Sequence, residues 1–570
     1  MRFVKGFIFI ATLFVWSDIQ AQTGTNPQNS LLPEINPQDI EIRSEFRARF
    51  PGLRRQPILG FNPKPRVFRI NPNRMPFMET RDEAVASIAI TQLDRPAPPS
   101  KSTLKTPDRT IGLLRAGVGS FVTPEAELYA FHSFNERTAA KANINYQSTD
   151  GHLDDHLSSF RFFDGSIGLR NQVSEDLSVS GDIGFLSDFN RVFDLAPIFQ
   201  AGIGETAKKE YLGFGAEVNV TQTKNALEGW ELNVGVNTVN IDLLAGATRS
   251  GEVNEQNFNV DFGKYWAGRK LYETFKVEGS VRGGNYQYSG ISSRQWIDAR
   301  GGLEYRKMLN FSAHISAKGG IAYVSDGLSS QLYINPELKL RYNLRDAVII
   351  TGSLWGRPEM NSVYEHHQIN RLLNTQTDLQ HSYNSGVSGE IAFQPLEGNR
   401  IFGGMTYQIT KDYAFYSRDV ETQGGTDFFT FYNVDYGKAN IFEFYGGITQ
   451  QLVAEKFWFD AKVYARRLKL SAGGDIPFEE RFGLNASLSY KLADDLTISG
   501  WSEYTGKREA PSSDEDLKAF VLVNGSAEYQ ITNRFGVYLK VLNILGQKYE
   551  LWEGYEERPF QVYGGLTVTF

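Results

Sequence analysis

The stretch that decides the fold is residues 457–466, which read Phe-Trp-Phe-Asp-Ala-Lys-Val-Tyr-Ala-Arg. Phe459, Ala461 and Val463 alternate with the polar residues Asp460 and Lys462. A period of two predicts a β-strand with one apolar face and one polar face, as a strand lying between lipid and water requires. The same alternation recurs at 230–237, 484–491 and 521–530, so we expect many such strands.

The connections between these windows favour a transmembrane barrel over a soluble sandwich. Short polar turns are expected at 174–176, 225–229, 267–270, 343–346, 396–399, 493–495 and 532–533, with similar turns near Glu136, Met308 and Glu455. Longer connections are expected at 190–208, 356–380, 411–437, 505–517 and 545–559. Short turns at one end and long loops at the other are typical of outer-membrane barrels. Ten short turns predict an all-β chain of about 22 strands, with 18 or 20 as alternatives.

Composition narrows the class of protein further. Aromatic residues make up 13% of the chain and glycine occurs 54 times, whereas hydrophobic residues reach only 41%. This describes a polar chain rich in strand formers rather than a helical membrane protein. The formal net charge of -7 is small for 570 residues, so a dedicated nucleic-acid binder is not expected. Cysteine is absent, which excludes disulfides, thiolate metal sites and a lipid-anchored cysteine.

The N-terminus has the zones of a secretory signal. Arg2 and Lys5 precede the apolar stretch 6–16, and Ala21 follows at a suitable cleavage position. The apolar run is shorter than the roughly 20 residues that a membrane-spanning helix needs. We therefore predict a signal peptide at 1–21 and export to the outer membrane.

Residues 22–110 differ in character from the rest. Thirteen prolines interrupt every candidate helix or strand, and the segment carries many arginines, including Arg43, Arg54 and Arg69. One interpretation is electrostatic docking, either as a partial lumen plug against inward carboxylates such as Glu231, Glu443, Asp460 and Glu528 or against a periplasmic protein partner. The other is a solvated tether. The barrel itself is expected to occupy 111–570.

The C-terminal end carries a family resemblance. Residues 541–549 read Val-Leu-Asn-Ile-Leu-Gly-Gln-Lys-Tyr and are followed by a loop and an alternating strand that ends in Phe570. This ending resembles the final hairpin of TonB-dependent receptors. The resemblance implies an outer-membrane barrel in contact with lipid and lipopolysaccharide, with solute transport or binding as its function. A terminal aromatic residue on such a strand also resembles the signal read by the outer-membrane assembly machinery, so Phe570 is the candidate assembly signal.

A second resemblance lies at the start of the barrel. Residues 117–121, followed by Thr-Pro-Glu-Ala-Glu-Leu-Tyr at 123–129, are similar to the barrel opening of receptor-like proteins from Bacteroidota. Receptors of the family carry a globular plug that is longer than residues 22–110. Because this segment is shorter and rich in proline, we expect no regular plug domain.

One region stands out as a candidate ligand site. Aromatic residues crowd the predicted connection 411–437, with aspartates between them. Aromatic faces beside hydrogen-bond acceptors suit glycans or other amphipathic ligands. The alternative is that half of them belong to the interfacial aromatic girdle. The candidate ligand-binding residues are Tyr413, Phe415, Tyr416, Phe428, Phe429, Phe431 and Tyr432.

No other pattern predicts chemistry. Glu365, His366 and His367 offer metal-binding groups, but adjacent residues on an extended loop point apart, so neither a metal nor a cofactor is expected. The strand histidines His132 and His314 have no nucleophile that sequence can assign to them, so an enzyme is not expected. Two functions remain open: a receptor-like barrel that transports or binds a solute, and a non-transporting scaffold or accessory barrel that anchors or assists other envelope proteins.

Overall fold

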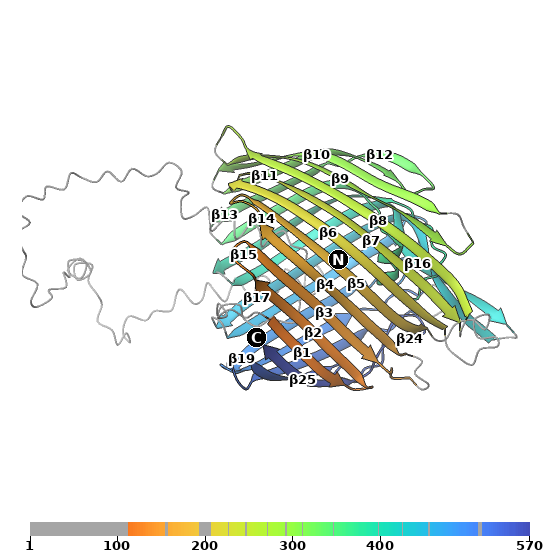
Figure 1. Ribbon diagram of the computed structural model, residues 1–570. Coiled ribbons are helices and arrows are strands. Elements are labelled where there is room, and N and C mark those ends of the chain that lie inside the picture. Colours follow the sequence, from red (N-terminus) through yellow and green to blue (C-terminus); the bar gives the residue numbers. More distant parts are fainter. Residues whose placement is uncertain are drawn as a thin grey trace, which may run out of the picture. The chain divides into compact units, whose positions relative to one another are not determined.

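The computed structural model describes residues 112–570, apart from the gaps 154–157, 193–206, 226, 246–247, 271, 291–292, 311, 346, 397, 424–425, 454–455 and 511–515. The predicted signal peptide and the extension at 22–110 therefore lie outside the described residues. The described chain forms one closed antiparallel sheet (Figure 1), and among its residues no helix is long and apolar enough to cross a membrane.

The first half of the sheet contains β1 (Gly112–Gly119), β2 (Thr123–Ser133), β3 (Thr138–Thr149), β4 (Phe160–Gln172), β5 (Leu177–Val192), β6 (Ala207–Asn225), β7 (Glu228–Ala245), β8 (Thr248–Ala267), β9 (Glu273–Tyr288), β10 (Arg294–Asn310) and β11 (Ala313–Ser325). The second half contains β12 (Ser330–Ile334), β13 (Glu337–Arg345), β14 (Val348–Glu359), β15 (Ser382–Leu396), β16 (Asn399–Gln423), β17 (Thr426–Val453), β18 (Phe457–Leu470), β19 (Phe482–Ala493), β20 (Leu496–Thr505), β21 (Phe520–Gln530), β22 (Phe535–Leu542) and β25 (Gln561–Thr569). Outside it lie helix α4 (Val363–Ile369) and the small hairpin of β23 (Glu550–Trp552) and β24 (Tyr555–Glu556).

The ring contains 22 positions because β12 and β13 occupy one of them. Both pair with β11, β12 through Ile321–Ser325 and β13 through Ala313–Lys318. Pro336 lies at the interruption, where it cannot donate a ladder hydrogen bond. Each of the 22 positions pairs with the next one along the chain, and β1 pairs with β25 to close the ring. The prediction of about 22 strands is confirmed.

Hairpin lengths also follow the prediction. All ten expected short turns join consecutive strands at the end of the barrel where β1 begins and β25 ends. We call this the short-turn end and the opposite end the loop end. Phe570 lies at the short-turn end, where its N–H donates to the carbonyl of Gly112 (3.0 Å) and its carbonyl accepts from the Gly112 N–H (2.6 Å).

One predicted connection is wrong. Residues 411–437 were expected to form a long loop, but they extend β16 and β17 into a paired hairpin that continues to Gln423 and Thr426. The aromatic residues in this region favour strands. Tyr432 also pairs with Leu373 of the connection between β14 and β15, so this connection adds a contact that stabilises the hairpin.

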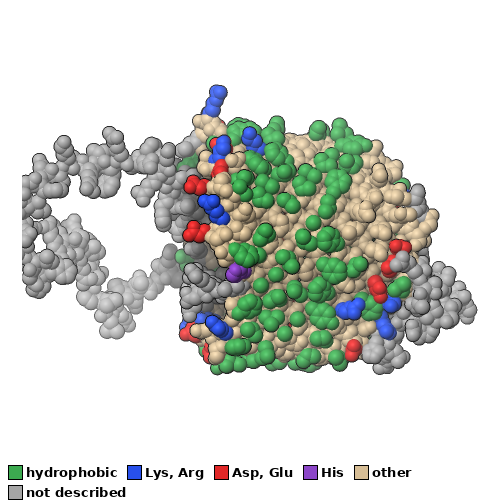
Figure 2. Space-filling view, viewed as in Figure 1, with side chains coloured by type: hydrophobic (Ala, Val, Ile, Leu, Met, Phe, Trp, Pro, Cys, Tyr) green, Lys and Arg blue, Asp and Glu red, His purple; other side chains and the backbone are tan. Residues whose placement is uncertain are grey.

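The outer face carries the apolar half of the alternation. Val234, Val236 and Val463 are among many large apolar side chains that remain exposed. Figure 2 shows such side chains spread over the middle of one face, with charged groups gathered near the two rims. A band of this kind is what lipid requires of a barrel's outer surface.

Candidate functional site

The inner wall is lined with polar side chains that bond to one another across strands. Lys276 lies 3.0 Å from Glu231, and Arg466 lies 2.6 Å from Glu443. Arg115 lies 3.6 Å from Glu528. Asp460 accepts a hydrogen bond from Thr449 (2.6 Å). The four carboxylates proposed from sequence as docking points for the arginine-rich extension thus each have a partner on the barrel wall.

The character of the inner wall changes along β7. Near the short-turn end its inward residues are polar, from Glu231 to Asn237, and its outward residues are apolar. Toward the loop end Val239, Ile241 and Leu243 point inward and are buried, while Thr238 and Asn240 point outward. The alternation therefore inverts, and the inner face at the loop end becomes a hydrophobic core.

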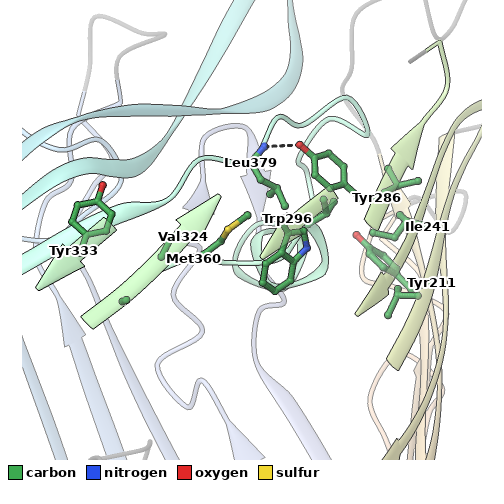
Figure 3. Packing of buried hydrophobic residues seen from close by; sticks show 12 residues of the cluster. Tyr211, Ile241, Tyr286, Trp296, Val324, Tyr333, Met360 and Leu379 are labelled. Atoms are coloured by element: carbon green, nitrogen blue, oxygen red, sulfur yellow. Dashed lines mark hydrogen bonds between the residues drawn. The ribbon is translucent and has the colours of Figure 1, made fainter. Parts of the chain in front are cut away.

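A single stretch of chain fills this core. We call Met360–His381, the connection between β14 and β15, the capping segment. Its residues Met360, Val363 and Leu379 pack against Trp296, Tyr286 and other inward side chains of β6 to β12. Figure 3 shows Leu379 beside Tyr286, and Met360 between Val324 and Trp296. The capping segment thus lies inside the loop end of the barrel.

Helix α4 begins the capping segment for a local reason. Ser362 is its N-cap and accepts a hydrogen bond from the Glu365 N–H (3.1 Å), while the Glu365 carboxylate accepts from the Ser362 N–H (2.7 Å). This reciprocal pair is a capping box. Glu365 is therefore committed to the helix start rather than to a metal site, and no cluster of metal-binding side chains occurs among the described residues.

Two buried polar side chains of the wall hold the helix. Glu255 on β8 accepts hydrogen bonds from the N–H groups of Val363 (3.0 Å) and Tyr364 (2.9 Å), which lie in the first turn, where a carboxylate is favoured. Lys209 on β6 is fully buried. Its Nζ lies 2.7 Å from His367 Nδ1 and donates to the carbonyl of Leu373 (2.6 Å).

The end of the capping segment is held in the same way. Asp326, in the loop between β11 and β12, accepts hydrogen bonds from the N–H (3.2 Å) and the ring Nδ1 (2.6 Å) of His381. Burial raises the pKa of Asp326, but its hydrogen bonds with His381, Ser329 and Leu328 outweigh this and hold the pKa below its usual range. Asp326 is thus an ionised anchor. The Leu379 N–H also donates to the Tyr286 hydroxyl (3.2 Å).

The capping segment crosses the loop end of the lumen, which we call the mouth. It contacts strands on nearly opposite sides of the barrel. Leu373 is held by Lys209 on β6 and pairs with Tyr432 on β17. Because β12 and β13 share a position, β17 is the sixteenth position of the ring and β6 the sixth, a separation of ten out of 22. A chain that contacts both must lie across the lumen.

Two histidines of α4 are buried in this contact. Burial lowers the pKa of His366 to about 4. Burial, together with the nearby Lys209 and His366, also lowers the pKa of His367 well below its usual value. His366 packs near the rings of Tyr416 and Tyr436. Both imidazoles are therefore neutral at pH 7, and the closed mouth is poorly suited to hold their protonated forms.

The aromatic residues predicted to bind ligand are divided between two hydrophobic clusters. Tyr416, Phe431 and Tyr432 belong to a buried cluster with Leu372 and Leu373 of the capping segment and with loop residues such as Phe478. Tyr413 and Phe415 pack against a second cluster, around Leu468 and Ile476. The side chains of Phe428 and Phe429 lie outside the described part of the structure. In this closed arrangement the described candidates pack against protein, and their contact with a ligand stays a prediction.

The resemblance motif near the C-terminus has a structural role. Asn543 adopts a positive φ of 49°. Its side chain accepts from the Gln547 N–H (3.1 Å) and donates to the Gln547 carbonyl (2.8 Å). The Gln547 side chain in turn accepts from the N–H of Val521 on β21 (2.8 Å). The motif thus ends β22 and fixes the following loop to its neighbour.

Sequence reasoning missed Lys209, Glu255 and Asp326. Each is one polar residue in or beside an alternating strand, and its partners lie far away in the sequence, up to 164 residues for Lys209. The one available signal was that Lys209 and Glu255 fall at positions where the inward face turns apolar.

No protein-family model matches the sequence, and no curated protein matches it. Solved structures do match. The ferric-catecholate import receptor Fiu from E. coli K12 is similar with a TM-score of 0.63 and 9% identity over 83% of this chain and 82% of that one. The copper transporter OprC gives 0.64 and 10%, and the siderophore receptor PirA from Acinetobacter baumannii gives 0.63 and 12%, each over 80% of both chains. At these identities the likeness shows the fold alone, a large antiparallel β-barrel.

Proposed function

We propose that this chain is an outer-membrane barrel of the TonB-dependent receptor type, which takes up a solute through its lumen and is closed at the loop end by the capping segment. The observation that carries the proposal is the capping segment itself, which crosses the mouth from Lys209 to Tyr432 above a polar inner wall. The structural neighbours support it, since they include a ferric-catecholate import receptor and a copper transporter.

The proposal includes orientation and partners. The loop end faces the outside, because outer-membrane barrels keep their short turns in the periplasm. The apolar band contacts lipid and the outer rim contacts lipopolysaccharide. Phe570 is read by the assembly machinery, and residues 22–110 plug part of the lumen or bind a periplasmic protein.

In this proposal the capping segment can move between a closed and an open position. Its anchors are a few hydrogen bonds to Glu255, Lys209 and Asp326, so a solute that binds the open mouth better than the closed one shifts the balance toward opening. A barrel that serves only as a scaffold has no use for such an equilibrium. The two functions therefore differ in what happens when the anchors are removed.

Conductance in planar bilayers tests whether the capping segment closes a transport lumen. Replacing Ser362–Leu379 by a short Gly-Ser linker in the full chain should raise single-channel conductance several-fold. A matched control is Glu217→Gln, an inward carboxylate that bonds to Asn233 on the wall and does not contact the capping segment; it should leave conductance unchanged. Equal conductance of the linker variant and the unaltered chain would favour the scaffold function.

A further inference from the structure

Below the capping segment the inner wall contains a cavity of about 400 Å³, a size within the range of small-molecule sites. It spans β6 to β11 and includes Asn335 just after β12, and its lining contains Asp261, Ser280, Arg300 and Lys318. The cavity lies in the polar part of the wall and contains both signs of charge.

Glycines of the inner wall make room for neighbouring side chains, since a Cβ on Gly263 would meet Lys276 and one on Gly302 would approach Lys318. Gly263, Gly302 and Gly320 occupy inward positions on β8, β10 and β11, at the level of Glu278 on β9. Two lysines reach across this level to carboxylates: Lys276 bonds to Glu231 (3.0 Å), and Lys318 bonds to Glu278. These two pairs satisfy their own charges, so they leave no net charge for a ligand.

The next row of inward residues toward the loop end is not neutralised in this way. Register places Asp261, Ser280 and Arg300 side by side on β8, β9 and β10. The Asp261 carboxylate accepts from the Asn259 amide (3.2 Å), and within the described residues it has no cationic partner. In the described part of the wall, a carboxylate without an ion-pair partner thus lines the cavity.

Positive charge is in excess on the next two strands, with Arg282 on β9 and Arg300 on β10. Arg300 Nε donates to Asp298 (2.7 Å), and Arg282 Nη2 bonds to the same carboxylate (3.1 Å). Asp298 is buried, and two guanidinium groups share its single negative charge. We call Arg282, Asp298 and Arg300 the Arg282–Arg300 corner. In the described part of the wall, its two guanidinium groups and one carboxylate leave one positive charge without a partner. The Cα atoms of Asp261 and Arg300 are about 10 Å apart, since they are two strand spacings apart.

We infer that this level of the wall is a binding site for zwitterionic solutes, specifically short peptides with a free ammonium group at Asp261 and a free carboxylate at the Arg282–Arg300 corner. An extended peptide spans at most about 3.3 to 3.6 Å per residue, so three residues match the separation. Asn219 and Asn233, aligned with Asp261 on β6 and β7, offer amide donors and acceptors for the peptide backbone.

The site is coupled to the cap through Arg300. Its Nη2 also donates to the carbonyl of Pro358 (3.0 Å), two residues before the capping segment begins. A carboxylate bound at Arg300 competes with this contact. The inference rests on the proposed function, because it names the class of solute that the capped lumen takes.

Calorimetric titration of the detergent-solubilised full chain and of the linker variant tests the inference. Triglycine should bind, whereas N-acetyl-triglycine amide and maltotriose should bind at least about ten-fold more weakly, because charged hydrogen bonds are lost. Asp261→Asn should weaken triglycine binding about ten-fold. The matched control Asp460→Asn, at an inward carboxylate on β18 that accepts a hydrogen bond from Thr449, should bind normally.

Equal affinity for free and blocked triglycine, stronger binding of maltotriose, or normal binding by Asp261→Asn would overturn the assignment. Binding and conductance separate the two proposals. If the linker variant conducts but does not bind triglycine, the peptide site is wrong and the transport function stands. If its conductance is unchanged as well, the proposed function fails.

Discussion

Strand β7 places its apolar side chains on opposite faces in its two halves. Near the short-turn end they point outward, and near the loop end they point into the barrel. In the first region Val234 points outward and remains exposed, while Asn233 faces the lumen; in the second Ile241 points inward and is fully buried. The first region separates lipid from water, whereas the second separates the outside from a protein core made by the capping segment. The direction of the alternation therefore reports the environment of each part of the strand.

The largest expected effect comes from placing a charged side chain on the outward face of β7 near the short-turn end. Val234→Arg should lower the free energy of unfolding by about 2 to 4 kcal/mol, whereas Thr238→Arg, on the same outward face beyond the inversion, should cost about 0 to 1 kcal/mol. Urea titration followed by heat-modifiable gel shift measures both. Equal costs at the two positions would show that the apolar band does not end where the alternation inverts.

A second expected effect is a pH dependence confined to the mouth. The pKa of His366 is about 4 in the closed mouth, against about 6.5 when the residue is exposed. As pH falls from 6.5 toward 4, the open form binds more protons, so closure loses up to about 3 kcal/mol and the loss ends below pH 4. Hydrogen exchange of α4 amides should therefore accelerate in this window.

The strands of the first region serve as the internal reference for that measurement, because their exchange should not follow the same titration. His367 contributes in the same direction, so the double variant His366→Phe, His367→Gln should remove most of the pH dependence. If the double variant keeps it, another group controls closure.

The smallest expected effect concerns a single anchor. Glu255→Ala leaves the N–H groups of Val363 and Tyr364 without their acceptor and should weaken protection of α4 by about 1 to 2 kcal/mol, the usual cost of a lost helix cap. Glu217→Ala, on the polar part of the wall, should leave α4 protection unchanged. Equal effects of the two changes would argue against a specific anchor.

The fold could be predicted from sequence because a barrel depends on local signals. Period-two windows such as 457–466 and short turns such as 174–176 specify strands and hairpins without knowledge of distant residues. The closing contact of Phe570 with Gly112 also follows from an alternating last strand.

The mouth could not be predicted because a period of two is blind to which face is inward. Val239, Ile241 and Leu243 take up the alternation in the opposite phase to Val234 and Val236, and the capping segment that buries them comes more than a hundred residues later in the sequence. The aromatic residues of 411–437 predict a loop because their aspartates interrupt the apolar pattern, whereas the structure continues β16 and β17 there and packs several of the aromatic side chains into two protein clusters.

The central claim, that the capping segment closes the lumen, has a direct test because the chain has no cysteine. A single cysteine introduced as Ser280→Cys lies in the cavity lining and can be labelled on intact cells with a membrane-impermeant thiol reagent. The account predicts slow labelling in the otherwise unaltered chain and labelling at least ten-fold faster when Ser362–Leu379 is replaced by the linker. Equal rates in the two proteins would contradict closure by the capping segment.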